Sequence, residues 1–137
     1  MTNRAITVPQ RIQEWAESAG ERRFVVEADG RAVTYAEFHA ESLRWAGAYQ
    51  ALGLQAGDTV VSMVKPSVSA YTSWLGMCWL RVVDAACNTD YRGQMLEYLL
   101  NNARSRVAVV EAVFLDRIAD VAADLDTLET VVVLGDE

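Results

Sequence analysis

The spacing of apolar positions changes part-way along the chain. Up to about residue 52, apolar residues recur at intervals of three and four, which is the period of an amphipathic helix. After residue 58, short uninterrupted apolar runs alternate with helical segments. The first helix is predicted over residues 8–19, where Pro9 suits the first turn. The pattern therefore predicts helices and a hairpin first, and strand-helix alternation afterwards.

A hairpin and a capped helix are predicted after the first helix. Residues 24–28 and 31–34 are the expected strands, and Asp29-Gly30 is a two-residue turn signal between them. Thr34 then begins the second helix, with Glu37 three positions later, as a capping box requires. The threonine hydroxyl and the glutamate carboxylate would each satisfy a backbone amide that the helix start leaves free.

The rest of the chain predicts an α/β fold. Strands are expected at residues 59–64, 82–87, 107–110 and 130–134, and helices at residues 67–81, 93–103 and 113–125. Uninterrupted apolar runs indicate strands that are covered on both faces. Strand-helix alternation favours a mainly parallel sheet with right-handed crossovers. The predicted architecture is a mainly parallel sheet with helices on both faces, preceded by an N-terminal helix and a β-hairpin. We assign residues 1–137 to one domain.

Composition excludes several classes of function. The chain has 137 residues, is 52% hydrophobic and carries a net charge of -7, which disfavours binding to nucleic acid or to an anionic membrane. Its longest uncharged stretch, residues 66–80, is too short for a spanning helix. No apolar signal-peptide core follows Met1, so a cytoplasmic protein is expected. Cys78 and Cys87 have no metal-ligand spacing and are expected to be buried thiols.

Glycines are the first place to look for a phosphate site, because Gly-rich loops present backbone amides to phosphate oxygens. The eight glycines are scattered, and none belongs to a P-loop or a dinucleotide-binding pattern. Gly53 and Gly57-Asp58 are a conceivable anion site. We favour a helix end followed by a turn into a strand, because the aspartate would repel a phosphate.

Other chemically capable residues have simpler explanations. His39 is the only histidine and has no evident orienting partner, so a half-buried surface role is expected and a Ser-His or Cys-His hydrolase is disfavoured. Asp116, Asp120 and Asp124 recur every four residues on one predicted helix. A solvated helix face explains them better than a cation site, which needs ligands from several directions.

Two segments remain as candidates for a binding role. The helix predicted over residues 67–81 is apolar around much of its surface. We favour a core helix, and the alternatives are a pocket wall or a face that further sequence covers. Residues 88–93 follow a strand and precede a helix, which is where α/β folds place site loops. Asn88 is expected to close the strand-end turn. Arg92 is an exposed candidate for binding an anion.

Three segments carry a family resemblance: residues 33–37 (VTYAE), 52–60 (LGLQAGDTV) and 88–93 (NTDYRG). In this order they resemble the N-terminal region of the AMP-forming acyl-CoA synthetases, within the adenylate-forming enzyme family. Residues 88–93, with residues 107–111, look most like crotonobetaine/carnitine-CoA ligases and fatty acyl-CoA synthetases. The resemblance extends from about residue 8 to the end of the chain.

The resemblance implies the first part of the large N-terminal domain of a longer enzyme. Members of the family join a carboxylate to AMP with release of pyrophosphate, and then transfer the acyl group to the thiol of coenzyme A. They need ATP and magnesium. Their phosphate cradle, a Ser/Thr/Gly-rich segment followed by a Lys, has no counterpart in this sequence. No catalytic, cofactor-binding or metal residue of the family can therefore be assigned here.

We expect this chain to be a scaffold fragment without ligase activity of its own. The expected partners are the remainder of the synthetase chain or a complementary subunit that brings the ATP site, with a small carboxylic acid as substrate of the intact enzyme. The alternative is a stand-alone, non-catalytic interaction module that keeps the scaffold. Three positions depart from the family pattern: Pro66 stands where Asn is usual, Arg81 replaces a Gly, and Ala86 replaces a Pro.

Overall fold

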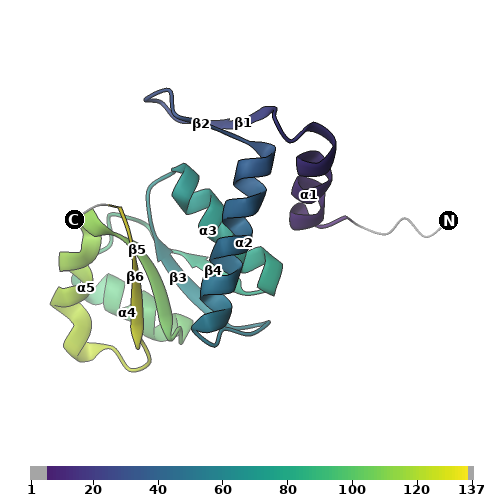
Figure 1. The fold of residues 1–137 in the computed structure, drawn as a ribbon. Coiled ribbons are helices and arrows are strands. Elements are labelled where there is room, and N and C mark those ends of the chain that lie inside the picture. Colours follow the sequence, from purple (N-terminus) through teal and green to yellow (C-terminus); the bar gives the residue numbers. More distant parts are fainter. Residues whose placement is uncertain (1–5, 136–137) are drawn as a thin grey trace. The chain divides into compact units, whose positions relative to one another are not determined.

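The computed structural model describes residues 6–135, and the chain forms two compact units (Figure 1). Unit 1 contains the residues up to Gln55 and the segment from Ser67 to Arg81. Unit 2 contains the segment from Ala56 to Pro66 and the residues from Val82 onward. Each unit is therefore built from two separate stretches of sequence.

Unit 1 is mainly helical. It consists of α1 (Val8–Ala19), β1 (Arg23–Val26), β2 (Ala32–Thr34), α2 (Tyr35–Ala51) and α3 (Val68–Leu80). Strands β1 and β2 pair antiparallel and form the expected hairpin. The strands are one or two residues shorter at the turn than predicted. The Glu27 amide still donates a 2.7 Å hydrogen bond to the Arg31 backbone oxygen, so the loop consists of residues 28–30 and is one residue longer than the predicted two-residue turn.

Side-chain caps start the helices of unit 1. The predicted capping box of α2 is present: the Glu37 amide donates to the Thr34 hydroxyl at 3.2 Å, and the Thr34 amide donates to the Glu37 carboxylate at 2.8 Å. Helix α1 has a second capping box, between Thr7 and Gln10. The sequence T-V-P-Q contains this signal in full, although we predicted only the role of the proline.

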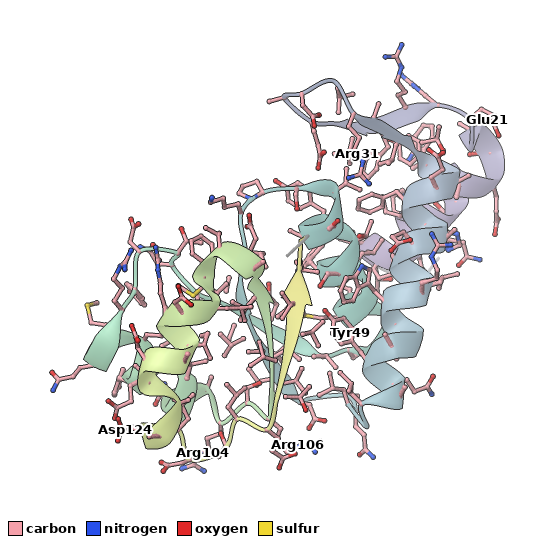
Figure 2. The ribbon with its side chains drawn as sticks, turned by 60° about the vertical axis from the view of Figure 1, so that its left-hand side comes forward. Glu21, Arg31, Tyr49, Arg104, Arg106 and Asp124 are labelled. Carbon is pink, nitrogen blue, oxygen red and sulfur yellow. The ribbon has the colours of Figure 1, made fainter. Side chains whose placement is uncertain are left out.

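Helices α2 and α3 pack at close range. A Cβ atom on Gly76 of α3 would lie 2.6 Å from the Cβ of Trp45 and 3.0 Å from the backbone nitrogen of Ala46, both on α2. The Tyr49 hydroxyl of α2 (labelled in Figure 2) lies 2.5 Å from the Ser73 hydroxyl of α3 in a buried hydrogen bond. A glycine and a polar pair therefore determine how these two helices meet.

Unit 2 is built on a four-stranded parallel sheet. Its strands are β3 (Thr59–Met63), β4 (Val83–Ala86), β5 (Val107–Glu111) and β6 (Thr130–Leu134), in the order β4-β3-β5-β6. All three pairings are parallel, with Val60 of β3 opposite Val107 of β5. The predicted α/β fold with a mainly parallel sheet, preceded by a helix and a hairpin, is confirmed.

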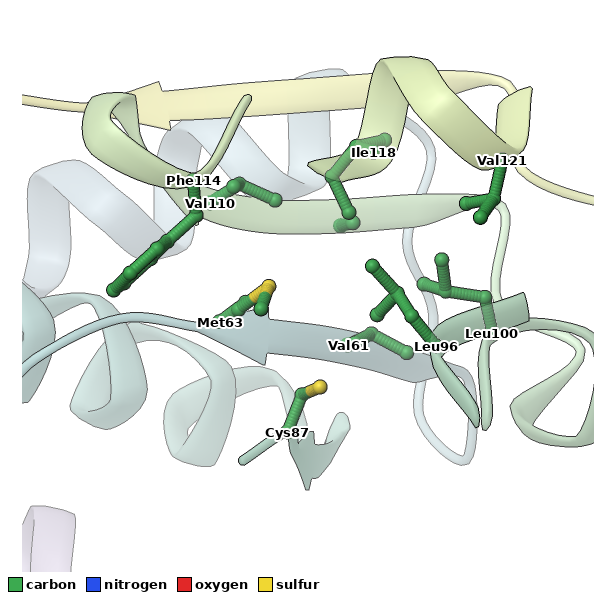
Figure 3. Packing of buried hydrophobic residues seen from close by; sticks show 10 residues of the cluster. Val61, Met63, Cys87, Leu96, Leu100, Val110, Phe114, Ile118 and Val121 are labelled. Carbon is green, nitrogen blue, oxygen red and sulfur yellow. The ribbon is translucent and has the colours of Figure 1, made fainter. Parts of the chain in front are cut away.

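One face of the sheet packs against α4 (Gly93–Ala103) and α5 (Leu115–Val121) (Figure 3). Alternate residues of β3 and β5 point into this core, as the period of two in a strand requires. The buried members of the cluster are Val61, Met63, Cys87, Leu96, Leu100, Ala108, Val110, Phe114, Ile118 and Val121. Burial of this apolar set is the main favourable term for unit 2.

The helix predicted over residues 113–125 is broken, which corrects that prediction. It consists of a 3-10 turn (Ala112–Phe114), α5, and a second 3-10 turn (Ala122–Asp124). Phe114 and Val121 have φ near -107° and -110° with ψ of 0°, which ends each regular stretch. Both side chains are buried in the core, so tertiary packing prevails over helical continuity at these two residues.

Arg81 explains one departure from the family pattern. It ends α3 in the left-handed region, with φ of 59°. Glycine is favoured in this conformation because it has no Cβ, so a family glycine is expected here. The arginine side chain is exposed. Arginine in place of glycine at this position therefore strains the backbone, but it does not bury a charge.

Candidate functional site at the carboxyl ends of the strands

The sheet of unit 2 has a topological switch point. The chain passes from β3 to β4 on one side and, after crossing to β5, continues to β6 on the other side. The loops after β3 and β5 therefore leave in opposite directions at the carboxyl ends of two adjacent strands. Open α/β sheets bind their ligands at such a point. We call the residues at these strand ends the rim: Lys65, Asn88, Thr89, Glu111, Phe114 and Arg117.

Lys65 and Glu111 join the two strand ends at the switch point. The backbone amide of Lys65, just after β3, donates a 2.7 Å hydrogen bond to a carboxylate oxygen of Glu111, the last residue of β5. Lys65 is the only lysine of the chain. The contact uses its backbone, so the glutamate positions the β3 loop without an ion pair to the ammonium group.

Phe114 lies beneath two cations. The Lys65 ammonium is 5.4 Å from the centre of its ring, and the Arg117 guanidinium carbon is 4.6 Å away. Both distances fit a cation–π contact, in which the negative face of the ring attracts the charge. Arg117 also donates a hydrogen bond to the backbone oxygen of Thr89. Two cationic side chains of the rim therefore contact the same aromatic ring.

The loop after β4 is closed by Asn88, as predicted. Its side-chain oxygen accepts a 2.9 Å hydrogen bond from the Asp90 amide, and its backbone oxygen accepts one from the Tyr91 amide at 3.1 Å. This local pattern is an Asx turn. Arg92 is exposed at the start of α4, and its side chain makes no capping hydrogen bond to that helix. The structure thus gives Asn88 a structural role and leaves Arg92 accessible to solvent.

Sequence reasoning missed Lys65, Glu111 and Arg117. The signal for the first two was available, since each lies at the end of a predicted strand, the position rule that selected Asn88. Arg117 carried no such signal, because it lies inside a predicted helix and its contact with Thr89 joins residues 28 positions apart.

Asp84 is a second unpredicted feature of unit 2. Its carboxylate accepts a 2.6 Å hydrogen bond from the Ser62 hydroxyl on the neighbouring strand. Burial raises the pKa of Asp84, and the hydrogen bond from Ser62 partly opposes this effect. Burial also raises the pKa of the Cys87 thiol, which disfavours the nucleophilic thiolate form.

The other sequence candidates are not among the rim residues. His39 is half-buried on α2, with its ring 5.8 Å from the ring of Trp79. Asp116, Asp120 and Asp124 are exposed. Asp124 precedes β6 and lies at the amino end of that strand (Figure 2). Within residues 6–135, no group of three or more His, Cys, Asp or Glu side chains could hold a metal ion.

Nucleotide binding has little support from the residues described. Gly53 and Gly57 have φ of 77° and 92° and serve the end of α2 and the turn before β3. Glycines with positive φ occur singly in residues 6–135, so they do not line up their amides as a phosphate cradle does. None of the helices in that range is long and apolar enough to cross a membrane.

A family model described as AMP-binding enzyme matches residues 12–137. The chain belongs to the AMP-binding enzyme family. The predicted resemblance to the N-terminal part of an AMP-forming acyl-CoA synthetase is confirmed.

Curated relatives of this family are aryl-CoA and acyl-CoA ligases. The chain is 29% identical to the 3-hydroxybenzoate–CoA/4-hydroxybenzoate–CoA ligase of Thauera aromatica over 89% of its own length and 23% of the relative. It is 34% identical to the benzoate–CoA ligase of the same organism over 78% of its own length and 20% of the relative. The chain thus spans about a fifth of the length of these relatives.

Solved structures agree with this assignment. The anthranilate CoA ligase AuaEII in complex with anthranoyl-AMP has a TM-score of 0.88 and 25% identity, covering 95% of this chain and 25% of that one. The N-terminal domain of FACL13 from Mycobacterium tuberculosis has a TM-score of 0.87 at 22% identity, which shows the common fold.

Proposed function

We propose that these residues form part of the scaffold of an ATP-dependent ligase that joins a carboxylic acid to coenzyme A, and that they do not catalyse the reaction alone. In the proposed reaction the carboxylate attacks the α-phosphorus of ATP, giving an acyl-adenylate and pyrophosphate. The thiolate of coenzyme A then displaces AMP and forms the thioester. The observation that carries the proposal is the family match over residues 12–137.

The contribution of this chain would be positional. Its parallel sheet brings three strand ends to one rim, and the Lys65–Glu111 hydrogen bond fixes the relation between β3 and β5. The binding of ATP and magnesium would depend on residues outside those described, because the glycines described here form no phosphate cradle. When bound, ATP would supply the leaving group that activates the carboxylate.

We further propose an aromatic carboxylic acid as the substrate class. The names of several relatives support this choice, since they specify hydroxybenzoate, benzoate and 4-coumarate. A structural neighbour holds anthranoyl-AMP, the adenylate of an aromatic acid. The sequence resemblance suggested ligases for fatty acids or crotonobetaine instead. Octanoate and crotonobetaine therefore serve as the substrates against which aromatic acids are compared.

Carboxylate-dependent exchange of labelled pyrophosphate into ATP tests the lack of activity. The purified 137-residue chain is expected to give no exchange above a protein-free blank with benzoate, 4-hydroxybenzoate, octanoate or crotonobetaine. The intact Thauera benzoate–CoA ligase is the positive control. Exchange by the chain alone would overturn the proposal that these residues are only a scaffold.

A chimera tests the scaffold role directly. This chain replaces the matching fifth of the Thauera benzoate–CoA ligase, and benzoyl-CoA formation is measured. Activity is expected, and it is expected to disappear in the same chimera with Gly76→Leu, which cannot pack α3 against α2. A folded but inactive chimera would contradict the scaffold role and favour the stand-alone interaction module.

A further inference from the structure

Unit 1 contains an apolar cavity that the proposed ligase function does not use. Its volume is about 260 Å³, and it opens to the surface of the unit. Ile12, Phe38 and Leu75 are buried and form the core beneath it. Apolar cavities of roughly 150 Å³ can stay dry and bind a benzene-sized molecule. This cavity is large enough for one or two fused rings.

One wall of the cavity contains Phe24, whose ring contacts two other aromatic rings. The ring of Phe24 stacks on Tyr35 at 4.3 Å and meets Phe38 edge-on at 5.0 Å. Tyr35 in turn stacks on Trp15 at 5.6 Å. Because Phe24 is held from two sides, the wall that it forms loses little freedom when a ligand binds.

Helix α3 provides the opposite wall. Tyr71 and Trp74 lie one helical turn apart and line the cavity, with 45% and 39% of their surface exposed. The start of α3 is fixed twice: the Ser67 hydroxyl accepts from the Ala70 amide, and the Glu27 carboxylate of the hairpin accepts from the Val68 amide at 2.6 Å. These caps hold the two aromatic side chains beside the hairpin.

We propose that this cavity is a binding site for a compact, uncharged aromatic molecule. Two observations select that class of ligand. The lining side chains described are all uncharged, so they complement a ligand without charge. Four of them, Phe24, Phe38, Tyr71 and Trp74, are aromatic and offer stacked or edge-on contacts to a ring.

The carboxylic acids on which the relatives act are poor ligands for this cavity. A carboxylate moved into it would lose water without gaining a hydrogen bond or a cation, which is costly. The inference is therefore independent of the proposed ligase function. The cavity can be occupied whether or not the ligase proposal holds.

Indole and indole-2-carboxylate are a matched pair of probes. Isothermal titration of the 137-residue chain is expected to give saturable, one-to-one binding of indole. The carboxylate is expected to bind at least about tenfold more weakly, because of the cost of burying its charge. Trp74→Ala and Tyr71→Ala are each expected to weaken indole binding by about tenfold, since each removes one wall. Trp74 and Tyr71 are both partly exposed, so the second variant still provides the test if the first one fails to fold.

Tyr98→Ala is the matched control, because Tyr98 is an exposed aromatic residue on α4, outside the cavity. It is expected to leave indole binding unchanged. Equal affinity for the two probes, no saturation with indole, or unchanged affinity in both wall variants would overturn the proposal. So would light scattering that shows a dimer which Trp74→Ala dissociates, because the aromatic groove would then be an interface between copies.

Discussion

Both units combine an apolar core with polar contacts between distant residues, and they differ in how their elements are joined. In unit 1, long-range contacts between polar groups fix the elements: Tyr49 with Ser73, and Glu27 with the start of α3. In unit 2, the strands pair in simple parallel register and an apolar cluster covers one face of the sheet. The exposed strand ends of unit 2 carry the charged rim, whereas unit 1 contains an uncharged aromatic cavity.

This difference separates the candidate sites by chemistry. A parallel sheet collects loop residues at one edge because all its strands point the same way, so charged groups from distant sequence meet there. A helical unit with a hairpin collects aromatic side chains in gaps between its elements. Unit 1 also holds all four tryptophans, at positions 15, 45, 74 and 79. Tryptophan fluorescence therefore reports on unit 1 alone, and this makes the comparison measurable.

The largest effect is expected from Leu96→Ala in the core of unit 2. Leu96 is fully buried on α4, against β3 and α5 (Figure 3). Removing its side chain leaves a cavity and is expected to cost about 3 kcal/mol of unfolding free energy in urea titrations. Met95→Ala is the control on the same helix, and it is expected to be nearly neutral because Met95 is exposed.

The same variant tests whether the chain is one domain. If residues 1–137 unfold as the single domain predicted from sequence, Leu96→Ala lowers the urea midpoint equally by circular dichroism and by tryptophan fluorescence. A fluorescence midpoint that stays at its original value would show that unit 1 unfolds independently of unit 2.

Gly76→Ala is expected to have the next largest effect, in unit 1. The added Cβ would lie 2.6 Å from the Cβ of Trp45, an atom that cannot move without its helix. We expect a loss of about 2 kcal/mol, measured by fluorescence-detected urea unfolding. Gly47→Ala on α2 is the matched control, because nothing lies within 4 Å of its new Cβ. It is expected to stabilise the helix by about 0.5 kcal/mol. Equal effects at the two glycines would contradict the close approach of α2 and α3.

The features that were predicted correctly are those that local sequence patterns determine. The sheet of unit 2 was predictable because apolar runs such as Thr59–Met63 and Val107–Glu111 report local burial. The cap of α2 was predictable because Thr34 and Glu37 are three residues apart. The position of Asn88 directly after a predicted strand also indicated correctly that its side chain closes the turn there.

Contacts between distant residues were not predictable in this way. Glu27 caps a helix that starts 41 residues later, and no local pattern marks it as a capping residue. The aromatic cavity depends on four elements that meet only in three dimensions. The Arg117 contact with Thr89 joins residues that are 28 positions apart. Local sequence patterns therefore predicted the helices and strands, whereas the contacts between distant side chains depend on tertiary packing.

A smaller effect is expected from the buried hydroxyl pair of unit 1. Tyr49→Phe and Ser73→Ala should each cost about 1 kcal/mol, because each removes the buried hydrogen bond between the two hydroxyls. The double variant should lose less than the sum of the two, since both single variants remove the same hydrogen bond. Fluorescence-detected urea unfolding of all four proteins gives the coupling energy. Strictly additive losses would show that the pair contributes nothing as a hydrogen bond.

The smallest effects are pH-dependent and have opposite signs in the two units. In unit 1, hydrogen bonds from the Thr34 backbone and side chain lower the pKa of Glu37. Stability from this contact is present above the unfolded-state pKa and is lost as the pH falls through the folded-state pKa. In unit 2, burial raises the pKa of Asp84, so the folded state binds the proton more tightly than the unfolded state. Stability is then lost as the pH rises from the unfolded-state pKa through the folded-state pKa.

Asp84→Asn and Glu37→Gln separate these two contributions. The asparagine keeps an oxygen that can accept the Ser62 hydrogen bond but carries no charge, so it is expected to raise the urea midpoint at neutral pH and to have little effect in acid. The glutamine keeps the capping box but loses the charge, so it should lower the midpoint slightly at neutral pH and not in acid. The test is the urea midpoint of each protein across the acid range. A neutral-pH loss of stability in Asp84→Asn would mean that the carboxylate is better solvated, or better paired, than its buried position on β4 implies.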